Sequence, residues 1–296
     1  MRVFVTGATG FVGSAVVQEL LSAGHQVLGL ARSDESARAL AATGAEVHRG
    51  TLEDIGSLRS GAAATDGVIH TAFIHDFSKF AANCETDRQA IEAMGAELAG
   101  SGRPFIITSG TAFINTGRTA TEEDTSDAGT TSIPRVATEI ATASIAKDGV
   151  NTSLLRLPPS VHGKGDHGFV PMLIAVAREK GISAYIGEGL NQWPAVHRLD
   201  AARVYRLALE KGAAGARYHA VADTGVPFRQ IAEAIGRGLN VPVVSISPEQ
   251  AAGHFGWFAH FAAINSPASS ILTQEQLGWE YTHQGLIADL DEGHYF

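Results

Sequence analysis

The sequence predicts an α/β protein built on a doubly wound parallel sheet of the Rossmann type. Short β-branched runs alternate with longer alanine-rich stretches from the start of the chain to about residue 158, a pattern typical of strand–helix repeats. The runs VFVTG, VLGLA, VIHTA and FIITS are almost continuously apolar, as expected for strands buried on both faces. A glycine-rich junction also follows the first run directly.

The first half of the chain divides into alternating elements. The predicted strands are Arg2–Thr6, Gln26–Ala31, Glu46–Arg49, Gly67–Thr71, Pro104–Thr108 and Thr152–Leu157. The predicted helices are 11–23, 34–43, 54–60, 77–99 and 134–148. Parallel strands joined by helices require right-handed crossovers, which place helices on both faces of the sheet.

Composition changes after Pro158 and Pro159, since every Trp and Tyr lies beyond residue 160. We therefore predict two domains, a Rossmann domain over 1–159 and a smaller substrate-binding lobe over 160–296, interleaved with the first. In the lobe we expect helices at Asp200–Lys211, with Asp200 as N-cap, and at 227–239, and a strand at Pro242–Ser247. The aromatic stretch His254–Phe261 is a buried helix, a subunit contact or a pocket wall.

Charge and cysteine content narrow the class of protein. The net charge of −9, from 22 basic and 31 acidic residues, offers no basic footprint for nucleic acid. The apolar N-terminus is interrupted by glycines and lacks a cleavage site, so we expect neither a signal peptide nor a membrane span. Cys84 has no partner for an internal disulfide, which favours a reducing, cytoplasmic location. The expected partners are a small-molecule substrate and, as an open alternative, a second copy in a homodimer.

The junction after the first strand reads Thr6-Gly7-Ala8-Thr9-Gly10-Phe11-Val12-Gly13. Glycines at these positions allow a sharp turn, close approach of the backbone to a pyrophosphate and tight helix–strand packing. The N-terminus of the following helix presents free N–H groups to phosphate. We therefore expect cofactor phosphates at Gly7, Thr9, Gly10, Phe11 and Val12; the alternative is a plain glycine turn.

TGATGFVG resembles the TGxxGxxG fingerprint of the extended and atypical short-chain dehydrogenases/reductases. Further matches are VIHTA, FIITSG, LLRLPPSVHG and VHRLDAARVYRLALE, so the resemblance covers nearly the whole chain. It implies that Thr71, Ala72, Phe73, Thr108 and Ser109, which follow or end the fourth and fifth strands, line the cofactor. It also implies that Pro158 flanks the nicotinamide.

The end of the second strand favours NADP(H) over NAD(H). NAD enzymes place an acid there for the ribose hydroxyls, whereas this chain has Ala31 followed by Arg32 and Ser33. A guanidinium beside a hydroxyl suits a 2′-phosphate, although Arg32 as a solvated surface residue is the alternative. The Gly-Asp-Leu adenine signature of the family reads Gly50-Thr51-Leu52 here, and the resemblance implies adenine contacts from Thr51 and Leu52.

The catalytic Tyr-x-x-x-Lys motif of the resembled family is missing. The first tyrosine is Tyr185, and none of the tyrosines is followed four residues later by Lys. Counting from the fifth strand places Arg135 at the Tyr position and Glu139 at the Lys position. The serine position falls on Gly110 or Thr111, and Ser109 matches the preceding hydroxyl.

Two interpretations of Arg135 and Glu139 stay open. At spacing i,i+4 they share a helix face, so they could form a surface ion pair. In the functional interpretation Arg135 stabilises a developing alkoxide electrostatically and Glu139 orients it. A guanidinium does not serve as proton donor at neutral pH.

Histidines after the sixth strand are further candidates, because imidazole transfers protons near neutrality. His162 is a catalytic candidate, and His167, Trp193 and His197 are substrate-binding candidates, with loop or core positions as the alternative. The twelve histidines show no HExxH or clustered Cys/His pattern, so we expect no metal site.

These features predict an NADP(H)-dependent oxidoreductase that transfers hydride to or from a small carbonyl or alcohol substrate. Two alternatives remain. One is a nucleotide-sugar epimerase or dehydratase, which the same fold supports. The other is a non-enzymatic NADP(H) sensor, which the missing Tyr-Lys pair favours.

Overall fold

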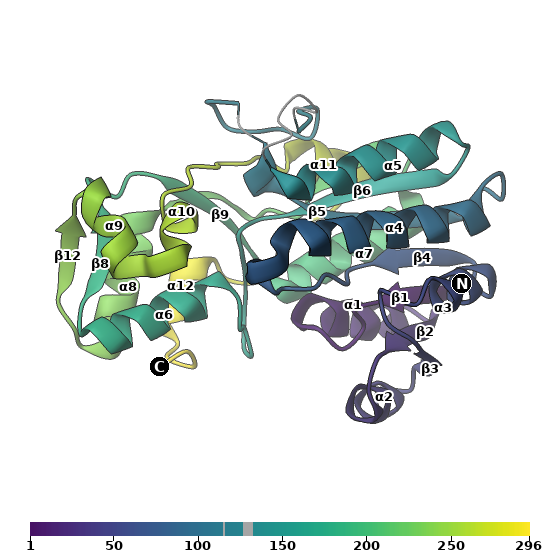
Figure 1. Ribbon diagram of the computed structural model, residues 1–296, viewed down its shortest axis with the longest axis horizontal. Helices are drawn as coiled ribbons and strands as arrows, with labels where there is room; N and C mark the ends of the chain where they lie inside the picture. The colour runs from purple at the N-terminus through teal and green to yellow at the C-terminus, as the bar shows by residue number, and fades with distance from the viewer. Residues whose placement is uncertain (115, 127–132) are drawn as a thin grey trace.

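The largest element of the computed structural model, which describes residues 1–114, 116–126 and 133–296, is a parallel sheet of seven strands (Figure 1). The strand order is β10-β6-β5-β4-β1-β2-β3. The strands are β1 (Arg2–Thr6), β2 (Gln26–Ala31), β3 (Glu46–Arg49), β4 (Gly67–His70), β5 (Pro104–Gly110), β6 (Asn151–Leu157) and β10 (Ala216–His219). The predicted Rossmann-type fold is confirmed, and the strand order reverses beside β1, where such folds bind ligands.

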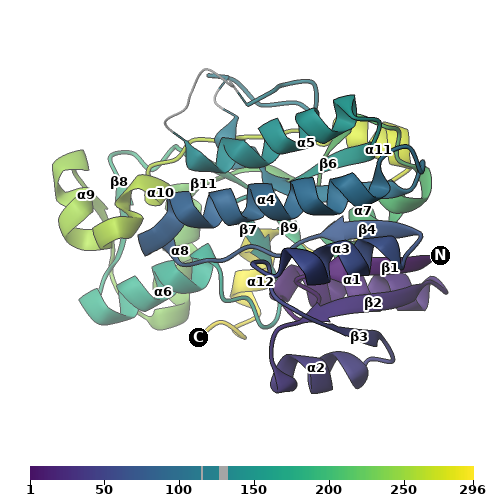
Figure 2. The same cartoon turned by 45° about the vertical axis from the view of Figure 1, so that its right-hand side comes forward.

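Helices cover both faces of this sheet, as Figures 1 and 2 show. One face packs against α3 (Ile55–Ala63), α4 (Phe80–Leu98) and α5 (Ala137–Lys147). The other packs against α1 (Phe11–Ser22), α2 (Asp34–Ala41) and α7 (Arg198–Lys211). Two helices start later than predicted, since short 3₁₀ turns, Phe77–Lys79 and Pro134–Val136, precede α4 and α5.

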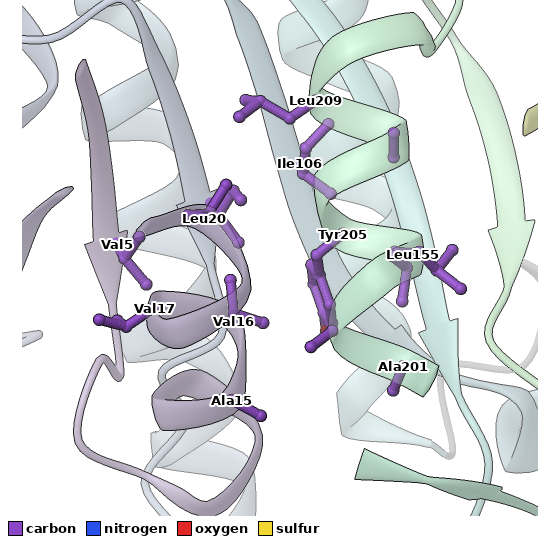
Figure 3. Close-up of a cluster of buried hydrophobic side chains, with 14 of the residues drawn as sticks. Val5, Ala15, Val16, Val17, Leu20, Ile106, Leu155, Ala201, Tyr205 and Leu209 are labelled. Atoms are coloured by element: carbon purple, nitrogen blue, oxygen red, sulfur yellow. The ribbon is translucent and has the colours of Figure 1, made fainter. Parts of the chain in front are cut away.

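The core on the α1 face lies between α1, α7 and the sheet (Figure 3). Val16 and Leu20 of α1 point into the space between the two helices. Tyr205 and Leu209 of α7 point into the same space from the other side. All four side chains are buried. Tyr205 adds a polar contact to this apolar packing, because its hydroxyl lies 2.8 Å from Thr108 Oγ1. Helix α7 is therefore fixed to the main sheet by packing and by a partly buried hydrogen bond.

The chain leaves the main sheet after β6 and returns to it in α7 and β10. A second sheet has three strands, in the order β11-β9-β7. The remaining elements are β7 (Ser160–His162), α6 (Phe169–Lys180), β8 (Ser183–Ile186), β9 (Gln192–His197), β11 (Asp223–Pro227), α8 (Phe228–Leu239), β12 (Val243–Ile246), α9 (Pro248–Phe255), α10 (Ala259–Ala262), α11 (Ile271–Leu277) and α12 (Leu286–Asp291). None of the helices within the described ranges is long and apolar enough to span a membrane.

The aromatic stretch His254–Phe261 is not one helix. Helix α9 ends at Phe255, and Gly256 follows with φ +58°, a left-handed conformation that glycine adopts readily. A 3₁₀ turn, Gly256–Phe258, then leads into α10. The break sends the aromatic side chains in two directions: Phe258 is buried, whereas Trp257 is 58% exposed. The stretch therefore combines a core contact with a surface that faces outward.

Asp200 does not cap α7 as we expected. The helix begins at Arg198, and the side chain of His197 accepts the capping hydrogen bond from Leu199 N. Asp200 is instead fully buried and accepts hydrogen bonds from the backbone N–H groups of Thr282 and His283. Its carboxylate thereby ties the C-terminal segment to α7.

Asp200→Ala should lower the free energy of unfolding at pH 7 by about 1–3 kcal/mol, because those N–H groups lose their acceptor. Burial would raise the pKa of Asp200, but hydrogen bonds from His283 and Thr282 lower it overall. A carboxyl group whose pKa is lower in the folded than in the unfolded state stabilises the fold at pH values above its unfolded-state pKa. The difference between wild type and variant should therefore shrink as the pH falls below about 4. Urea titrations over this pH range measure it, and equal stability at pH 7 would contradict this role for Asp200.

Candidate functional site

The loop between β1 and α1 is shaped by its glycines. Gly7 has φ +68°, and the N–H of Gly10 donates to the carbonyl oxygen of Gly7 at 2.9 Å. A Cβ on Gly13 would lie only 2.0 Å from that same oxygen. The loop thus closes tightly, which requires glycine at both Gly7 and Gly13.

The N-terminus of α1 is open to a bound anion. Its N-cap, Gly10, contributes no side-chain hydrogen bond to the first turn. Thr9 and Gly10 are exposed, while Phe11 and Val12 are half-buried. The uncapped backbone N–H groups and the positive end of the helix dipole suit a pyrophosphate. The residues predicted to bind cofactor phosphates therefore fit that group.

The end of β2 partly matches the predicted NADP site. Arg32 is exposed, and its guanidinium makes no hydrogen bond to another described residue. The Ser33 hydroxyl, by contrast, is occupied in a capping box at the start of α2, where it accepts from Ser36 N at 3.1 Å. Ser33 therefore has a structural role that the sequence analysis did not assign to it.

Arg49 is a second cation at this edge, and sequence reasoning missed it. The parallel register of β2 and β3 pairs Ala31 with Arg49. The Arg49 guanidinium donates to the backbone oxygen of Ser33 and pairs with Asp34. Its position as the last residue of a strand beside Ala31 was the available signal.

The other predicted cofactor residues lie along the carboxyl edge of the sheet. Thr51 and Leu52 follow β3 and are half-buried, and Pro158 follows β6. After β4, the hydroxyl of Thr71 donates to the carbonyl oxygen of Thr6 at 2.8 Å. Ala72 lies against the glycine loop, since a Cβ on Gly7 would approach its nitrogen to 2.7 Å.

Arg135 is buried at the same edge, in the 3₁₀ turn before α5. Its Nη1 donates to Asp87 Oδ2 at 2.6 Å, and its Nη2 donates to the backbone oxygen of Thr108 at 3.2 Å. The guanidinium lies over the ring of Phe73, 4.0 Å from its centroid. A cation is therefore held rigidly beside two segments that the sequence analysis assigned to the cofactor.

A buried network connects Arg135 with the glycine loop. His70 Nε2 lies 3.1 Å from Asp87 Oδ1, and it must donate because the carboxylate only accepts. The other ring nitrogen lies 2.7 Å from Thr6 Oγ1. Burial would raise the pKa of Asp87, but the Arg135 charge and the His70 hydrogen bond lower it to about 2. Asp87 thus stays ionised beside the guanidinium.

The predicted pairing of Arg135 with Glu139 is wrong. Arg135 precedes the first turn of α5, so the i,i+4 geometry of a continuous helix does not apply. Glu139 accepts instead from Arg156 of β6, at 2.9 Å and 2.8 Å. Because Arg156 is fully buried, the pair is neither a surface ion pair nor a means of orienting Arg135.

Ser109 and Thr111 occupy different environments. The Ser109 hydroxyl donates to Glu139 Oε1 at 2.9 Å, so it belongs to the Glu139–Arg156 network. Thr111 is fully buried, and its hydroxyl has no hydrogen-bond partner among the described residues. Neither hydroxyl contacts Arg135, so the predicted catalytic residues form two adjacent groups.

None of the predicted histidines forms a hydrogen bond with Arg135 among the described residues. His162 is fully buried, and its Nδ1 lies 2.9 Å from Asp289 Oδ2. Burial, with a contribution from His283, lowers the pKa of His197 to about 4. The His197 ring is therefore neutral at pH 7. His167 is exposed and meets the Phe11 ring edge-on, at 5.7 Å between centroids, which places it beside the glycine loop.

Trp193 does not line a substrate cleft. It is fully buried and packs against Phe228 and Phe258 in the core of the small lobe. Trp193 lies in β9, and the aromatic side chains packed against it exclude it from the surface where a substrate would bind. Trp193 therefore contributes to the hydrophobic core and not to a substrate site.

A polar cavity of about 580 Å³ opens beside the C-terminal segment. It is lined by Lys164, His197, Thr282, His283, Gln284, Asp289, Glu292 and His294. Within the described part of the chain, one trio of these side chains, Asp289, Glu292 and His294, lies close enough to share a metal ion. Asp289 already accepts from His162, and the trio is otherwise exposed.

Comparison with known proteins matches residues 3–222 to the NAD dependent epimerase/dehydratase family. An uncharacterized protein of Schizosaccharomyces pombe is 53% identical over 100% of both chains. A 4-hydroxy-2-methyl-3-oxo-4-farnesyl-3,4-dihydroquinoline-1-oxide ketoreductase of Stigmatella aurantiaca is 27% identical over 90% of this chain and 84% of the relative. Among solved structures, a dTDP-glucose 4,6-dehydratase from Streptomyces venezuelae is 19% identical, with a TM-score of 0.77 over 98% of this chain and 96% of the other.

Glu139→Gln should destabilise the protein by about 3–5 kcal/mol, because it leaves the Arg156 guanidinium buried without its counter-charge. The double variant Glu139→Gln, Arg156→Met should recover much of that loss, since both charges are then gone. Chemical denaturation of the three proteins measures both effects. A single variant as stable as wild type would show that the pair contributes nothing to the fold.

Proposed function

Because the chain belongs to the NAD dependent epimerase/dehydratase family, we propose that it is an NADP(H)-dependent oxidoreductase that transfers hydride to or from a small carbonyl or alcohol substrate. The observation that carries this proposal is the buried guanidinium of Arg135 at the carboxyl edge of the sheet, where the family motif places a tyrosine. The name of the ketoreductase relative supports carbonyl chemistry.

The glycine loop and the N-terminus of α1 would hold the cofactor phosphates, with Thr71–Phe73 and Pro158 beside the ribose and nicotinamide. The nicotinamide supplies or accepts the hydride when it is bound. Arg32 and Arg49 would face the 2′-phosphate. Two guanidinium groups, and Ala31 in place of the acid at the end of β2, are the basis for NADP(H) rather than NAD(H).

In this proposal Arg135 takes over the electrostatic role of the tyrosine in the Tyr-x-x-x-Lys motif. Its guanidinium donates a hydrogen bond to the substrate oxygen and stabilises the negative charge that develops there as the carbonyl carbon gains a hydride. Water provides the proton that completes the alcohol. Asp87 and His70 act as positioning residues, because they hold the guanidinium through the buried network. Their position keeps the charge aimed before substrate arrives, which is how preorganised donors act.

NADPH should bind at least tenfold more tightly than NADH, a difference of about 1.4 kcal/mol. Arg32→Glu should remove or reverse that preference, because a carboxylate repels the 2′-phosphate. Arg38→Glu, on the exposed side of α2, is the matched control and should leave the preference unchanged. Calorimetric titrations of both cofactors provide the test. Equal affinities in the wild type would contradict the proposed NADP(H) specificity.

Arg135→Ala should lower kcat/KM for carbonyl reduction by roughly 10²–10³, about 2.7–4 kcal/mol, by analogy with the loss of an oxyanion donor. NADPH affinity should change by only a few-fold, which also checks that the variant folds. Thr138→Val is the comparison variant: it removes a hydroxyl that accepts from Arg135 Nη1 and donates to Asp87 but keeps the guanidinium, so it should lose much less activity than Arg135→Ala. Steady-state NADPH oxidation with a panel of carbonyl compounds gives both values.

Two outcomes would contradict the proposal. Equal losses in Arg135→Ala and Thr138→Val would make Arg135 a structural residue only. Tight NADPH binding without turnover of any carbonyl in the panel, or of any alcohol with NADP⁺, would favour the sensor.

A further inference from the structure

Six aromatic side chains gather next to Arg135 and form what we call the aromatic wall. They are Phe73, Phe77, Phe80, Phe169, Trp257 and Phe261. The wall begins at the Phe73 ring, which carries the Arg135 guanidinium at 4.0 Å. It therefore continues directly from the proposed site of reaction.

The rings contact one another in an unbroken series. Phe73 meets Phe80 at 6.1 Å between centroids, and Phe80 stacks on Phe77 at 5.8 Å. Phe77 then stacks on Trp257 at 5.1 Å, with 28° between the ring planes. Distances of this size are typical of interacting aromatic pairs. The series leads from the buried cation to an exposed indole.

Both lobes contribute to the wall. Phe73, Phe77 and Phe80 follow β4 of the main sheet, whereas Phe169 begins α6 and Trp257 lies in the turn after α9. Five of the rings are half-buried, and Trp257 is 58% exposed, although Trp193 and Trp279 are fully buried. An apolar surface left open in this way, beside a candidate site, indicates a binding surface.

The charges around the wall favour a neutral ligand. The positive charge of Arg135 is already matched by Asp87 at 2.6 Å. Desolvation and the nearby Arg135 lower the pKa of His75, which disfavours a second cation at that position. Lys79, between Phe77 and Phe80, is exposed to solvent, so among the described residues the buried end of the wall offers no unpaired cation to a diphosphate or carboxylate. A carbonyl oxygen needs only a hydrogen-bond donor.

We propose that the aromatic wall binds the apolar body of the substrate, a neutral ketone or aldehyde with an aromatic or similarly flat substituent. The carbonyl group then reaches Arg135, while the substituent lies against Phe77 and Trp257. This inference rests on the proposed carbonyl chemistry. Continuity of the wall with Arg135 favours substrate over a second copy of the chain as its occupant.

Intrinsic fluorescence tests the inference without turnover. The protein saturated with NADP⁺ is titrated with 4-phenylbutan-2-one, which this oxidised cofactor cannot reduce. Trp257 is the exposed tryptophan of the three, so the ketone should change its emission in a saturable manner. Hydroxyacetone, a small polar ketone, should bind at least tenfold more weakly. Trp257→Phe should lose the signal but keep the affinity by calorimetry, because a ring is still present.

Variants then locate the binding surface. Phe77→Ala and Trp257→Ala should each weaken 4-phenylbutan-2-one roughly tenfold, as expected when an aromatic contact is lost. Tyr281→Ala removes another exposed aromatic side chain outside the wall and should have no effect. In turnover, the two wall variants should raise KM for 4-phenylbutan-2-one more than they lower kcat.

The outcomes separate this inference from the proposed function. If 4-phenylbutan-2-one binds no better than hydroxyacetone while both are reduced, the wall is not the substrate site, although the oxidoreductase stands. Saturable binding at Trp257 without reduction of any carbonyl would overturn the function and leave an apolar-ligand site. A concentration-dependent dimer that Trp257→Ala dissociates would make the wall a subunit interface, which would overturn the inference.

Discussion

The buried ion pair between Arg135 and Asp87 is the interaction on which the candidate site depends. Two charges out of water are costly unless each is well paired and hydrogen-bonded. Here Asp87 also accepts from His70 and Thr138, so the carboxylate is fully satisfied. The pair therefore fixes the Arg135 guanidinium in one orientation beside the glycine loop.

In the proposed function, a guanidinium cannot act in the same way as the tyrosine of the family motif. A phenol both donates a proton and stabilises an oxyanion, whereas a guanidinium retains its proton near neutral pH. The lowered pKa of Asp87, about 2, likewise removes the carboxylate as an acid at physiological pH. In the proposed function the site therefore acts by electrostatic stabilisation, and solvent provides the proton.

A second buried pair, Glu139 with Arg156, lies beside the first and supports α5 on β6. Its carboxylate also binds Ser109 and Ser126. Arg135 and Glu139, which the sequence analysis assigned to the Tyr and Lys positions, are thus parts of two separate networks. One of these networks faces the aromatic wall through Phe73, and the other holds the scaffold together.

The sequence was sufficient for most strands of the main sheet and for the tight glycine turn after β1, because strand periodicity and glycine spacing are local signals. β1, β2 and β3 begin and end as predicted. It was not sufficient for Asp87, His70, Arg49 or Arg156, since their roles arise from pairing across strands and helices far apart in the chain. The error over Arg135 and Glu139 has a local cause, the 3₁₀ turn at Pro134–Val136, which an i,i+4 spacing does not reveal.

Trp193, Asp200 and His162 illustrate the same limit. Each is a residue type often found in functional sites, and each is fully buried here. Burial depends on which segments cover a strand, and a single sequence does not show this. Trp257, by contrast, was part of an aromatic stretch whose exposed side became evident only when Gly256 was seen to break the helix.

A crystal structure of the protein with NADP⁺ and an unreactive carbonyl ligand tests the central claim most directly. The account predicts that the carbonyl oxygen lies about 2.7–3.1 Å from a nitrogen of Arg135, the distance expected of an oxyanion donor. A ligand whose oxygen is bound by another side chain, with the Arg135 guanidinium still bonded only to Asp87, Thr138 and Thr108, would contradict it.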